Sequence, residues 1–439
     1  MVHHTMNASS KPAPRDSSKI SSMFSDVWIG WTLPYRAAWS VAIVGMLVSC
    51  ASSVPRPTSL PAPSAAPPVL RPESVKPAPV TSPPLSQPTV PQPAPRFEPP
   101  VKGESKSRWV PVPIEDLPGW PQESMAEVWT LLLANCDISG TVLAPLCSDI
   151  RRLSIASETE QRLLLLSRLQ AYRLESLEGE TSGLLTAYYE PVFEAQRLAG
   201  NGFNTPLYAT PPGAGNGKPW FTRQDIESLP AAQNALRGRE IAWLADPVDA
   251  LILHIQGSGR LRITEPDGSV RTVRVGFAAS NDQPYQSVGR WLLDKGETRD
   301  ASWPGIKAWL QRNPQRRQEL LWTNPRYVFF KEEPMGADPS VGPRGAQGIP
   351  LVAGRSVAID PLSIPYGTPL WLVSPGPTQA LSRLVLAQDT GSAIVGAVRA
   401  DFFMGTGRDA GEVAGRLKQP LRLWALWPKP GLLRPSASQ

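Results

Sequence analysis

Three aspartates stand in apolar company near the C-terminus and are the side chains best suited to acid–base chemistry. They are Asp360 in Val-Ala-Ile-Asp-Pro, Asp389 in Leu-Ala-Gln-Asp-Thr-Gly and Asp401 in Arg-Ala-Asp-Phe-Phe. A carboxylate loses favourable hydration when it leaves water, so aspartate is rare in such surroundings without partners or a purpose. The alternative for each, taken alone, is an aspartate that only forms a turn or caps a helix.

Asp401 has the strongest chemical signature of the three. Phe402 and Phe403 follow it directly, and Gly405-Thr-Gly407 then predicts a tight turn that a polymer could approach. Aromatic neighbours desolvate a carboxyl group and raise its pKa, which keeps an acid protonated near neutral pH. We therefore predict that Asp401 is a catalytic acid, whereas Asp360 fixes the turn before Pro361.

The rest of the composition excludes several other chemistries. The only histidines are His3, His4 and His254, which argues against zinc and di-metal hydrolase sites built from several imidazoles. The chain has no phosphate-binding GxxxxGK[ST] loop and no CxxC pair. We therefore expect neither a metal nor another cofactor. A net charge of +6 without a basic stripe also argues against a nucleic-acid partner.

Asp389 also begins the segment Asp-Thr-Gly-Ser, which ends at Ser392 and matches a motif of aspartic proteases. Those enzymes use two aspartates that share one proton. This chain has a single Asp-Thr-Gly, so a protease would need a homodimer or an unrelated second aspartate.

The N-terminal region predicts export and a lipid anchor. An apolar run of about a dozen residues, Ala37 to Val48, is too short to span a bilayer and fits a signal peptide. It ends in Leu-Val-Ser-Cys, which looks like a lipobox that makes Cys50 the lipidated first residue of the mature protein. An ordinary signal peptide or anchor with an incidental cysteine is the alternative.

A proline-rich tether follows the predicted anchor. From Pro55 to Pro100 there are 17 prolines among 46 residues. Such a segment cannot bury a core and favours extended or disordered chain, which could reach roughly 140 Å. We assign residues 1–49 to the signal peptide and 50–105 to the lipidated cysteine and tether. Because export permits disulfides, we predict that Cys136 and Cys147 pair; two free buried thiols are the alternative.

The folded part begins with helices and continues mainly with strands. Helices are predicted over Met125 to Ala134, from the Ser157-Glu-Thr-Glu capping box through Tyr172, over Thr222 to Leu229 and over Ala410 to Leu417. Strands are predicted over Gly183 to Pro191, Ala250 to Ile255, Gly259 to Ile263, Val270 to Val275, Val357 to Ile359, Pro369 to Val373, Leu384 to Ala387 and Leu421 to Trp427. Asp267-Gly268 predicts a hairpin turn. The Gly- and Pro-rich residues 332–350 predict a boundary or a long active-site loop.

Several stretches, taken in order, closely resemble the membrane-bound lytic murein transglycosylase A family with its C-terminal three-aspartate domain. The matching stretches are Leu117–Trp120, Thr186–Pro191, Ile255–Gly259, Pro284–Tyr285, Asn324–Pro325, Tyr327–Phe330, Arg355–Asp360 and Asp389–Gly407. The chain departs from the family pattern after Asp389, where Thr390-Gly391-Ser392 replaces Gly-Gly. It departs again at Met404, where the family often has an aromatic residue.

The resemblance implies a mainly β fold with helices. A double-psi β-barrel domain would comprise residues 106–191 and 335–430, with N-terminal helices and a short tail at 431–439. A smaller barrel-like β domain, residues 192–334, would be inserted into it, and glycan strands of peptidoglycan would lie in the groove between the two.

The resemblance also implies an activity, that of a peptidoglycan lyase of the exotransglycosylase type. It would cleave the β-1,4 bond between N-acetylmuramic acid and N-acetylglucosamine without water and form 1,6-anhydromuramic ends. Asp401 would be the catalytic acid and then the base. Candidates for sugar contacts are Thr186, Tyr189, Gln256, Asp389 and Gly391.

The same resemblance implies a location and partners. The protein would sit on the periplasmic side of the outer membrane, anchored through lipid, with peptidoglycan and other cell-wall enzymes as partners. The competing interpretation from another class is a non-enzymatic lipoprotein that only binds the cell wall through its barrel.

Overall fold

The computed structural model describes residues 105–336 and 338–429. The predicted signal peptide, the lipidation site at Cys50, most of the tether and the tail lie outside the described residues. Within these ranges, every helix is too short or too polar to cross a lipid bilayer.

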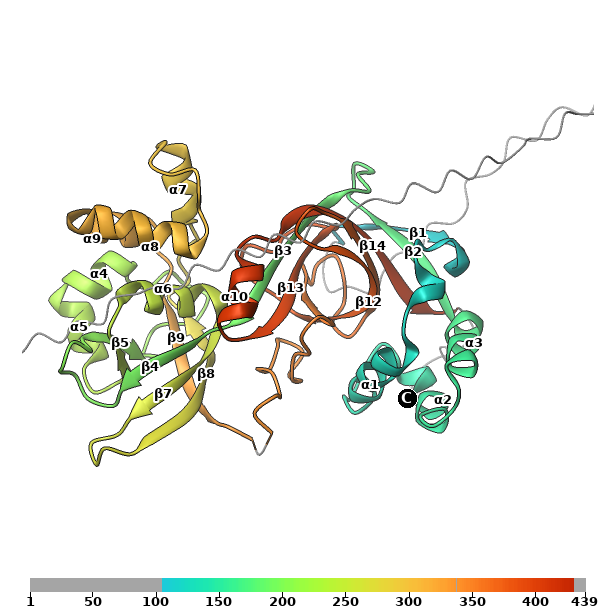
Figure 1. Cartoon of the computed structure of the whole chain (residues 1–439), viewed down its shortest axis with the longest axis horizontal. Coiled ribbons are helices and arrows are strands. Elements are labelled where there is room, and N and C mark those ends of the chain that lie inside the picture. The colour runs from blue at the N-terminus through green and yellow to red at the C-terminus, as the bar shows by residue number, and fades with distance from the viewer. Residues whose placement is uncertain (1–104, 337, 430–439) are drawn as a thin grey trace, which may run out of the picture. The chain divides into compact units, whose positions relative to one another are not determined.

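A closed six-stranded barrel forms the centre of the described fold (Figure 1). The hydrogen-bonded order is β14-β11-β12-β10-β13-β3, and pairing of β3 with β14 closes the ring. The pairs β10/β12 and β3/β13 are parallel, whereas the others are antiparallel. The strands are β3 Gly183–Glu190, β10 Ser356–Ala358, β11 Pro369–Pro375, β12 Ala380–Asp389, β13 Arg399–Thr406 and β14 Lys418–Pro428. The predicted mainly β fold with a barrel at its centre is confirmed.

Two further strands and three helices extend the barrel on the side away from the second sheet (Figure 1). The strand β2 (Leu169–Glu175) continues from β14, and β1 (Arg108–Val112) pairs with β2. The helices α1 (Met125–Cys136), α2 (Cys147–Arg152) and α3 (Glu158–Arg168) share an apolar core with the barrel wall. The predicted disulfide between Cys136 and Cys147 is present and joins the end of α1 to the start of α2.

The predicted capping box at Ser157 is present, but the helix that it begins is shorter than expected. Ser157 accepts from the Glu160 backbone N–H, and the Glu160 carboxylate accepts from the Ser157 N–H. The helix ends at Arg168 instead of running through Tyr172. Its last expected turn forms β2 because pairing with β1 and β14 satisfies the backbone there, so tertiary context overrides the helical leucine spacing.

A second, six-stranded sheet is formed by the residues between β3 and the long loop after residue 334. Its order is β5-β6-β4-β7-β8-β9. The strands are β4 Val192–Gln196, β5 Thr205–Tyr208, β6 Glu240–Leu244, β7 Ser258–Thr264, β8 Val270–Ser280 and β9 Val328–Pro334. The helices are α4 Arg223–Ser228, α5 Pro230–Leu236, α6 Pro247–Gln256, α7 Val288–Asp294, α8 Trp303–Arg312 and α9 Arg317–Trp322. The last helix, α10 (Arg408–Ala414), returns to the barrel and packs against β3 and β13.

Short-range turn and cap signals in this part are confirmed. Asp267-Gly268 lies in the hairpin between β7 and β8, where Gly268 adopts φ +84°. Thr222 caps α4 through a capping box with Asp225. Short 3₁₀ helices over Ile114–Asp116, Trp120–Gln122, Ala144–Leu146 and Pro314–Arg316 complete the described elements.

The strand predicted over Ala250 to Ile255 is wrong, because these residues form most of α6. The side chain of Asp246 caps the helix by accepting from the Val248 N–H, and Pro247 occupies the first turn. Gly257 ends the helix in the left-handed region at φ +77°. A short, mostly apolar run has the same pattern in a buried helix and in a buried strand, so the flanking residues Asp246, Pro247 and Gly257 held the deciding signal.

Candidate active site

A cavity of about 630 Å³ lies where the barrel meets the second sheet. Strands β3 and β13 and the loop after β12 line it from the barrel, and the end of α6 with parts of β8 and β9 line it from the second sheet. Several residues between 343 and 351 also contribute to the wall, and all but Leu351 belong to the Gly- and Pro-rich segment 332–350. The predicted interpretation of that segment as an active-site loop agrees with this position.

Asp401 lines the cavity from β13, beside Thr186 of β3 in the parallel register. The Thr186 hydroxyl donates to Oδ1 of Asp401, and Arg399 Nη2 donates to Thr186 Oγ1 at 2.8 Å. A guanidinium has no acceptor, so the threonine oxygen must accept from Arg399 and its single hydrogen must point to Asp401. Among the described residues no hydrogen bond occupies Oδ2 of Asp401, which leaves that oxygen available to a ligand.

Burial raises the pKa of Asp401 above its usual value. The hydrogen bond from Thr186 and the positive charge of Arg399 act against this shift, and the nearby charge of Asp389 adds to it. The carboxyl group is therefore held closer to protonation than an exposed aspartate. Thr186 and Arg399 stabilise the ionised form, so the carboxyl group can also lose its proton. A group that gives and then takes a proton needs both forms.

Asp389 also lines the cavity, but both of its oxygens are already bonded. Tyr188 Oη donates to Oδ2 at 2.8 Å, and the Ala346 backbone N–H donates to Oδ1 at 3.0 Å. Burial raises the pKa of Asp389, while these donors oppose the rise. Asp389 thus ties the loop at Ala346 to strand β3. The two donors stabilise the ionised form of Asp389 and fix the position of its side chain.

Asp360 has the turn-fixing contacts predicted from its sequence context. It is buried, and it accepts from the backbone N–H groups of Leu362 at 3.0 Å and Gly396 at 2.8 Å. It does not line the cavity.

Four of the five predicted sugar contacts line the cavity, namely Thr186, Gln256, Asp389 and Gly391. Gln256 is the last residue of α6, and its Oε1 accepts from the Tyr189 backbone N–H at 3.0 Å. This bond directs the amide of Gln256 and links α6 to β3.

The structure does not bring the Tyr189 side chain to the cavity. Neighbouring side chains of a strand point to opposite faces, so the ring of Tyr189 lies away from that of Tyr188. It packs instead on α10, where a Cβ atom at Gly411 would lie 2.7 Å from the ring. Tyr189 therefore contributes its backbone N–H, and the expected ring contact is not supported.

The cavity also contains polar residues that the sequence did not single out as site residues, among them Tyr188, Tyr285 and Arg399. Tyr188 could have been found, because it shares one face of β3 with Thr186 at a spacing of two. Tyr285 entered the sequence argument only as part of the Pro284–Tyr285 stretch that resembles the family. Burial raises the pKa of both tyrosines, so both hydroxyls are held protonated.

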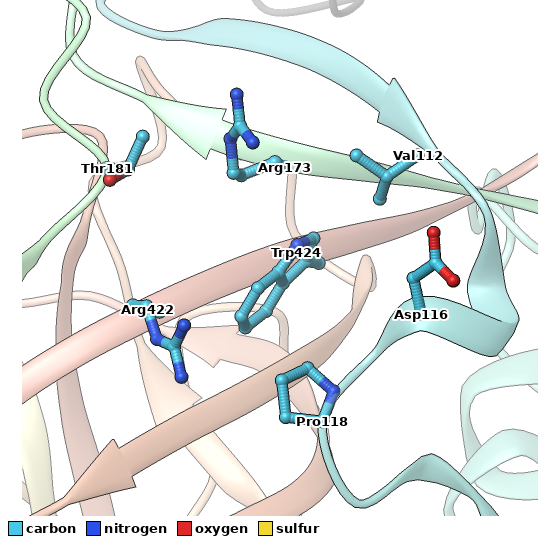
Figure 2. A pocket seen from close by; sticks show the side chains of 7 residues that line it. All are labelled: Val112, Asp116, Pro118, Arg173, Thr181, Arg422 and Trp424. Carbon is cyan, nitrogen blue, oxygen red and sulfur yellow. The ribbon is translucent and has the colours of Figure 1, made fainter.

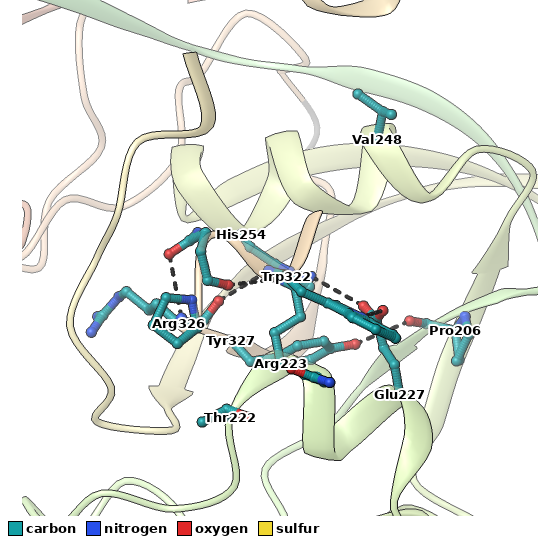
Figure 3. A network of polar contacts seen from close by, with 12 residues as sticks. Pro206, Thr222, Arg223, Glu227, Val248, His254, Trp322, Arg326 and Tyr327 are labelled. Carbon is teal, nitrogen blue, oxygen red and sulfur yellow. Dashed lines mark hydrogen bonds and ion pairs between the residues drawn. The ribbon is translucent and has the colours of Figure 1, made fainter. Parts of the chain in front are cut away.

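A buried polar network supports the wall that the second sheet contributes (Figure 3). Arg223 is 2% exposed and donates to the backbone oxygens of Asn324 and Arg326, both cavity residues. It also lies 2.7 Å from Nδ1 of His254 in α6, and only the imidazole can accept in this pair. Burial, followed by the charge of Arg223, lowers the pKa of His254 well below its usual value. His254 is thus a neutral structural residue, and its network fixes α6 relative to residues 324–326.

No group of three or more His, Cys, Asp or Glu side chains within residues 105–336 and 338–429 could hold a metal ion.

Two family models match the chain, one over the second sheet and one over the C-terminal part of the barrel. The family model of the MltA specific insert domain matches residues 184–331, and that of the 3D domain matches residues 355–427. Membrane-bound lytic murein transglycosylase A of Escherichia coli (strain K12) is 32% identical over 275 residues, which cover 60% of this chain and 70% of that protein.

Solved structures agree with the sequence relatives. The lytic transglycosylase LtgG of Burkholderia pseudomallei is 38% identical with a TM-score of 0.51, over 77% of this chain and 98% of that one. MltA from Neisseria gonorrhoeae is 30% identical with a TM-score of 0.60, over 76% and 96%. Escherichia coli MltA with bound chitohexaose is 26% identical with a TM-score of 0.59, over 77% and 100%. The chain belongs to the membrane-bound lytic murein transglycosylase A family.

Proposed function

We propose that this protein is a lytic transglycosylase that cleaves the β-1,4 bond between N-acetylmuramic acid and N-acetylglucosamine in peptidoglycan. The observation that carries the proposal is the contrast between the two cavity aspartates. Burial raises the pKa of both, but Asp401 has one oxygen without a partner among the described residues, whereas Asp389 has donors on both oxygens. The names of the relatives, which are lytic murein transglycosylases, support the same reaction.

In the first step, protonated Asp401 gives its proton to the glycosidic oxygen. The bond between that oxygen and C1 of the muramic acid breaks, and the N-acetylglucosamine leaves with a hydroxyl group. Positive charge develops at C1 and its ring oxygen as the electron pair departs. The Asp401 carboxylate formed in this step lies beside the Thr186 hydroxyl, which donates to it and stabilises its charge.

In the second step, the Asp401 carboxylate takes the proton of the muramic C6 hydroxyl. The C6 oxygen bonds to C1 and closes the 1,6-anhydro ring, and Asp401 is again protonated. No water enters, so one carboxyl group serves both steps. An ordinary glycosidase needs a second carboxylate as base or nucleophile, and the bonded state of Asp389 does not suit that role.

The surrounding residues would position the glycan. We assign sugar contacts to Thr186, Gln256 and Gly391, and a supporting role to Asp389, which holds the loop at Ala346. We further propose two domains, a discontinuous barrel domain of residues 106–191 and 335–430 and an inserted domain of residues 192–334. The glycan would lie in the groove between them.

The proposed place of action is the periplasmic face of the outer membrane. Its basis is the predicted lipidation of Cys50 and the membrane-bound relatives. The proline-rich tether would let the two domains reach peptidoglycan at a distance from the lipid.

The products released from purified sacculi test the reaction type. We expect mass spectrometry to show muropeptides one water lighter than those from lysozyme-type cleavage, because the C6 hydroxyl replaces water as the nucleophile. Ordinary reducing ends would show hydrolysis, and binding to sacculi without soluble products would favour the non-enzymatic lipoprotein.

The pH dependence should follow the protonation of Asp401. Because the first step needs the protonated acid, kcat/KM should fall as the pH rises through the raised pKa. Thr186→Val removes a donor that lowers this pKa, so the alkaline limb should move to higher pH. The matched control, Thr272→Val on an exposed position of β8, should leave the profile unchanged. A limb that stays in place or moves to lower pH in Thr186→Val would contradict this assignment.

A further inference from the structure

A second cavity, of about 360 Å³, lies on the flank of the barrel and takes no part in the proposed reaction (Figure 2). Its walls come from β1, β2, β14 and the short helix at Ile114–Asp116. Val112 and Pro118 contribute apolar side chains, whereas the other lining residues are charged, polar or aromatic.

Trp424 lies at the centre of this cavity, and its N–H lacks a partner (Figure 2). The residue is only 7% exposed, yet within the described part of the chain no hydrogen bond engages its indole N–H. The indole nitrogen keeps some accessible surface, and because Trp424 lines the cavity, the N–H can be reached from it. This N–H is therefore a donor that an acceptor bound in the cavity can use.

Two guanidinium groups flank the indole (Figure 2). Arg422 stacks over the Trp424 ring at 5.6 Å, and none of the described acidic residues forms an ion pair with it. Arg173 donates through Nε and Nη2 to one oxygen of Glu175, which leaves its Nη1 unassigned. Arginine forks and an indole N–H together match a carboxylate, because all of these groups are donors.

The opposite end of the cavity carries a negative charge. Asp116 is exposed, and its carboxylate has no hydrogen bond or ion pair within residues 105–336 and 338–429. Arg422 and Asp116 are drawn on opposite sides of Trp424 (Figure 2). The site therefore suits a short ligand that carries a carboxylate at one end and an ammonium group at the other.

We infer that this cavity binds a zwitterionic peptide, and that in the cell this is a peptide stem of peptidoglycan. The source of the peptide rests on the proposed function, because the stems are attached to the glycan that the enzyme would cleave. Stems that contain a diamino acid carry both free carboxylates and a free amino group. The carboxylate would contact Arg422, Arg173 and the Trp424 N–H, and the ammonium group would contact Asp116.

The position of the cavity agrees with a stem on the same substrate. Thr181 lines it, and Thr186 of the candidate active site lies five residues further along the chain. Five residues span at most about 18 Å. A stem of three or four residues reaches about 10–14 Å, which is less than this largest span, so the stem that enters the cavity would belong to a sugar bound on the Thr181 side of Thr186.

Calorimetric titration of the full-length protein with the tripeptide L-Ala-γ-D-Glu-meso-diaminopimelate tests the inference. We expect one site, with affinity reduced at least about tenfold by Arg422→Ala, since a charge-assisted hydrogen bond contributes about 1.5–3 kcal/mol. Acetylation of the diaminopimelate side-chain amine should weaken binding to the wild type but not to Asp116→Asn, whereas acetylation of the alanine amine, which is an amide in peptidoglycan, should not weaken it. Arg312→Ala, at an exposed arginine of α8, is the matched control and should bind normally.

Three results would overturn the inference: no binding to the wild type, unchanged binding to Arg422→Ala, or competition by a peptide-free glycan. The inference also predicts that Arg422→Ala cleaves peptide-free glycan at the wild-type rate. Binding is measured without turnover, so its failure is distinct from failure of the lytic activity, which the products from sacculi report.

Discussion

Asp401→Asn should abolish the release of anhydro-muropeptides from isolated sacculi, with a rate at least about 10³-fold below that of the wild type. A single proton donor and acceptor contributes up to about 10⁴-fold, and in the proposed mechanism Asp401 serves both steps. Asparagine keeps the shape of the side chain but cannot give and then take a proton. Product release would be followed by mass spectrometry over a time course long enough to detect residual turnover.

Asp401→Asn should keep the fold. At a pH above the pKa of Asp401, its free energy of unfolding should equal or slightly exceed that of the wild type. The folded state raises this pKa, so it binds the proton more tightly than the unfolded chain, and ionisation of Asp401 at higher pH reduces stability. Because asparagine does not ionise, the variant does not lose stability in this way. Asp409→Asn, at an exposed aspartate in the first turn of α10, is the matched control and should keep full activity. Normal turnover by Asp401→Asn together with an inactive Asp389→Asn would transfer the catalytic role to Asp389.

Glu190→Gln should lower the free energy of unfolding by about 3–5 kcal/mol, the usual result when one partner of a buried ion pair is removed. Glu190 is fully buried at the end of β3. It accepts from Arg260 Nε at 2.8 Å, from Arg274 Nε at 2.6 Å and from Thr406 Oγ1 at 2.7 Å. The substitution would leave two nearly buried guanidinium groups without their carboxylate.

The same contacts connect three parts of the chain. Arg260 lies on β7 and Arg274 on β8, so Glu190 joins the barrel to the second sheet. Both arginines also donate to the loop, Arg260 to the Pro339 oxygen and Arg274 to the Val341 oxygen, each at 2.6 Å. We therefore expect Glu190→Gln to reduce activity as well, because this loop carries Ala346 to Asp389.

Chemical denaturation would measure the effect, with Glu194→Gln as the matched control. Glu194 on β4 pairs with Arg262 of β7 at 2.9 Å, but both side chains are more than half exposed. An exposed ion pair contributes about 0–1 kcal/mol, so the control should differ little from the wild type. Equal effects of the two substitutions would show that the buried junction does not stabilise the fold as we describe.

The sequence predicted features whose physical cause is local. The capping box at Ser157, the helix that begins after Thr222 and the turn at Asp267-Gly268 depend on a few adjacent residues, and the structure confirms all three. The placement of Asp401 beside a pair of phenylalanines was likewise visible in adjacent residues.

Features that depend on distant pairing could not be derived in the same way. Thr186 meets Asp401 because β3 and β13 pair in parallel across 215 positions of sequence. The bond from Ala346 to Asp389 and the contacts of Glu190 likewise join segments that no local pattern connects. Residues Leu169 to Tyr172 were predicted as helix from the leucine spacing, but they form a strand because they pair with distant strands.

The most direct test of the account is a crystal structure of Asp401→Asn with a peptidoglycan glycan oligomer bound. We predict that the side chain of residue 401 lies about 2.6–3.2 Å from the oxygen of the bond to be cleaved, the range for direct proton transfer. The C6 hydroxyl of the muramic acid should lie within reach of the same side chain. An oligomer whose glycosidic oxygen lies beside Asp389 instead, or far from residue 401, would contradict the proposed mechanism.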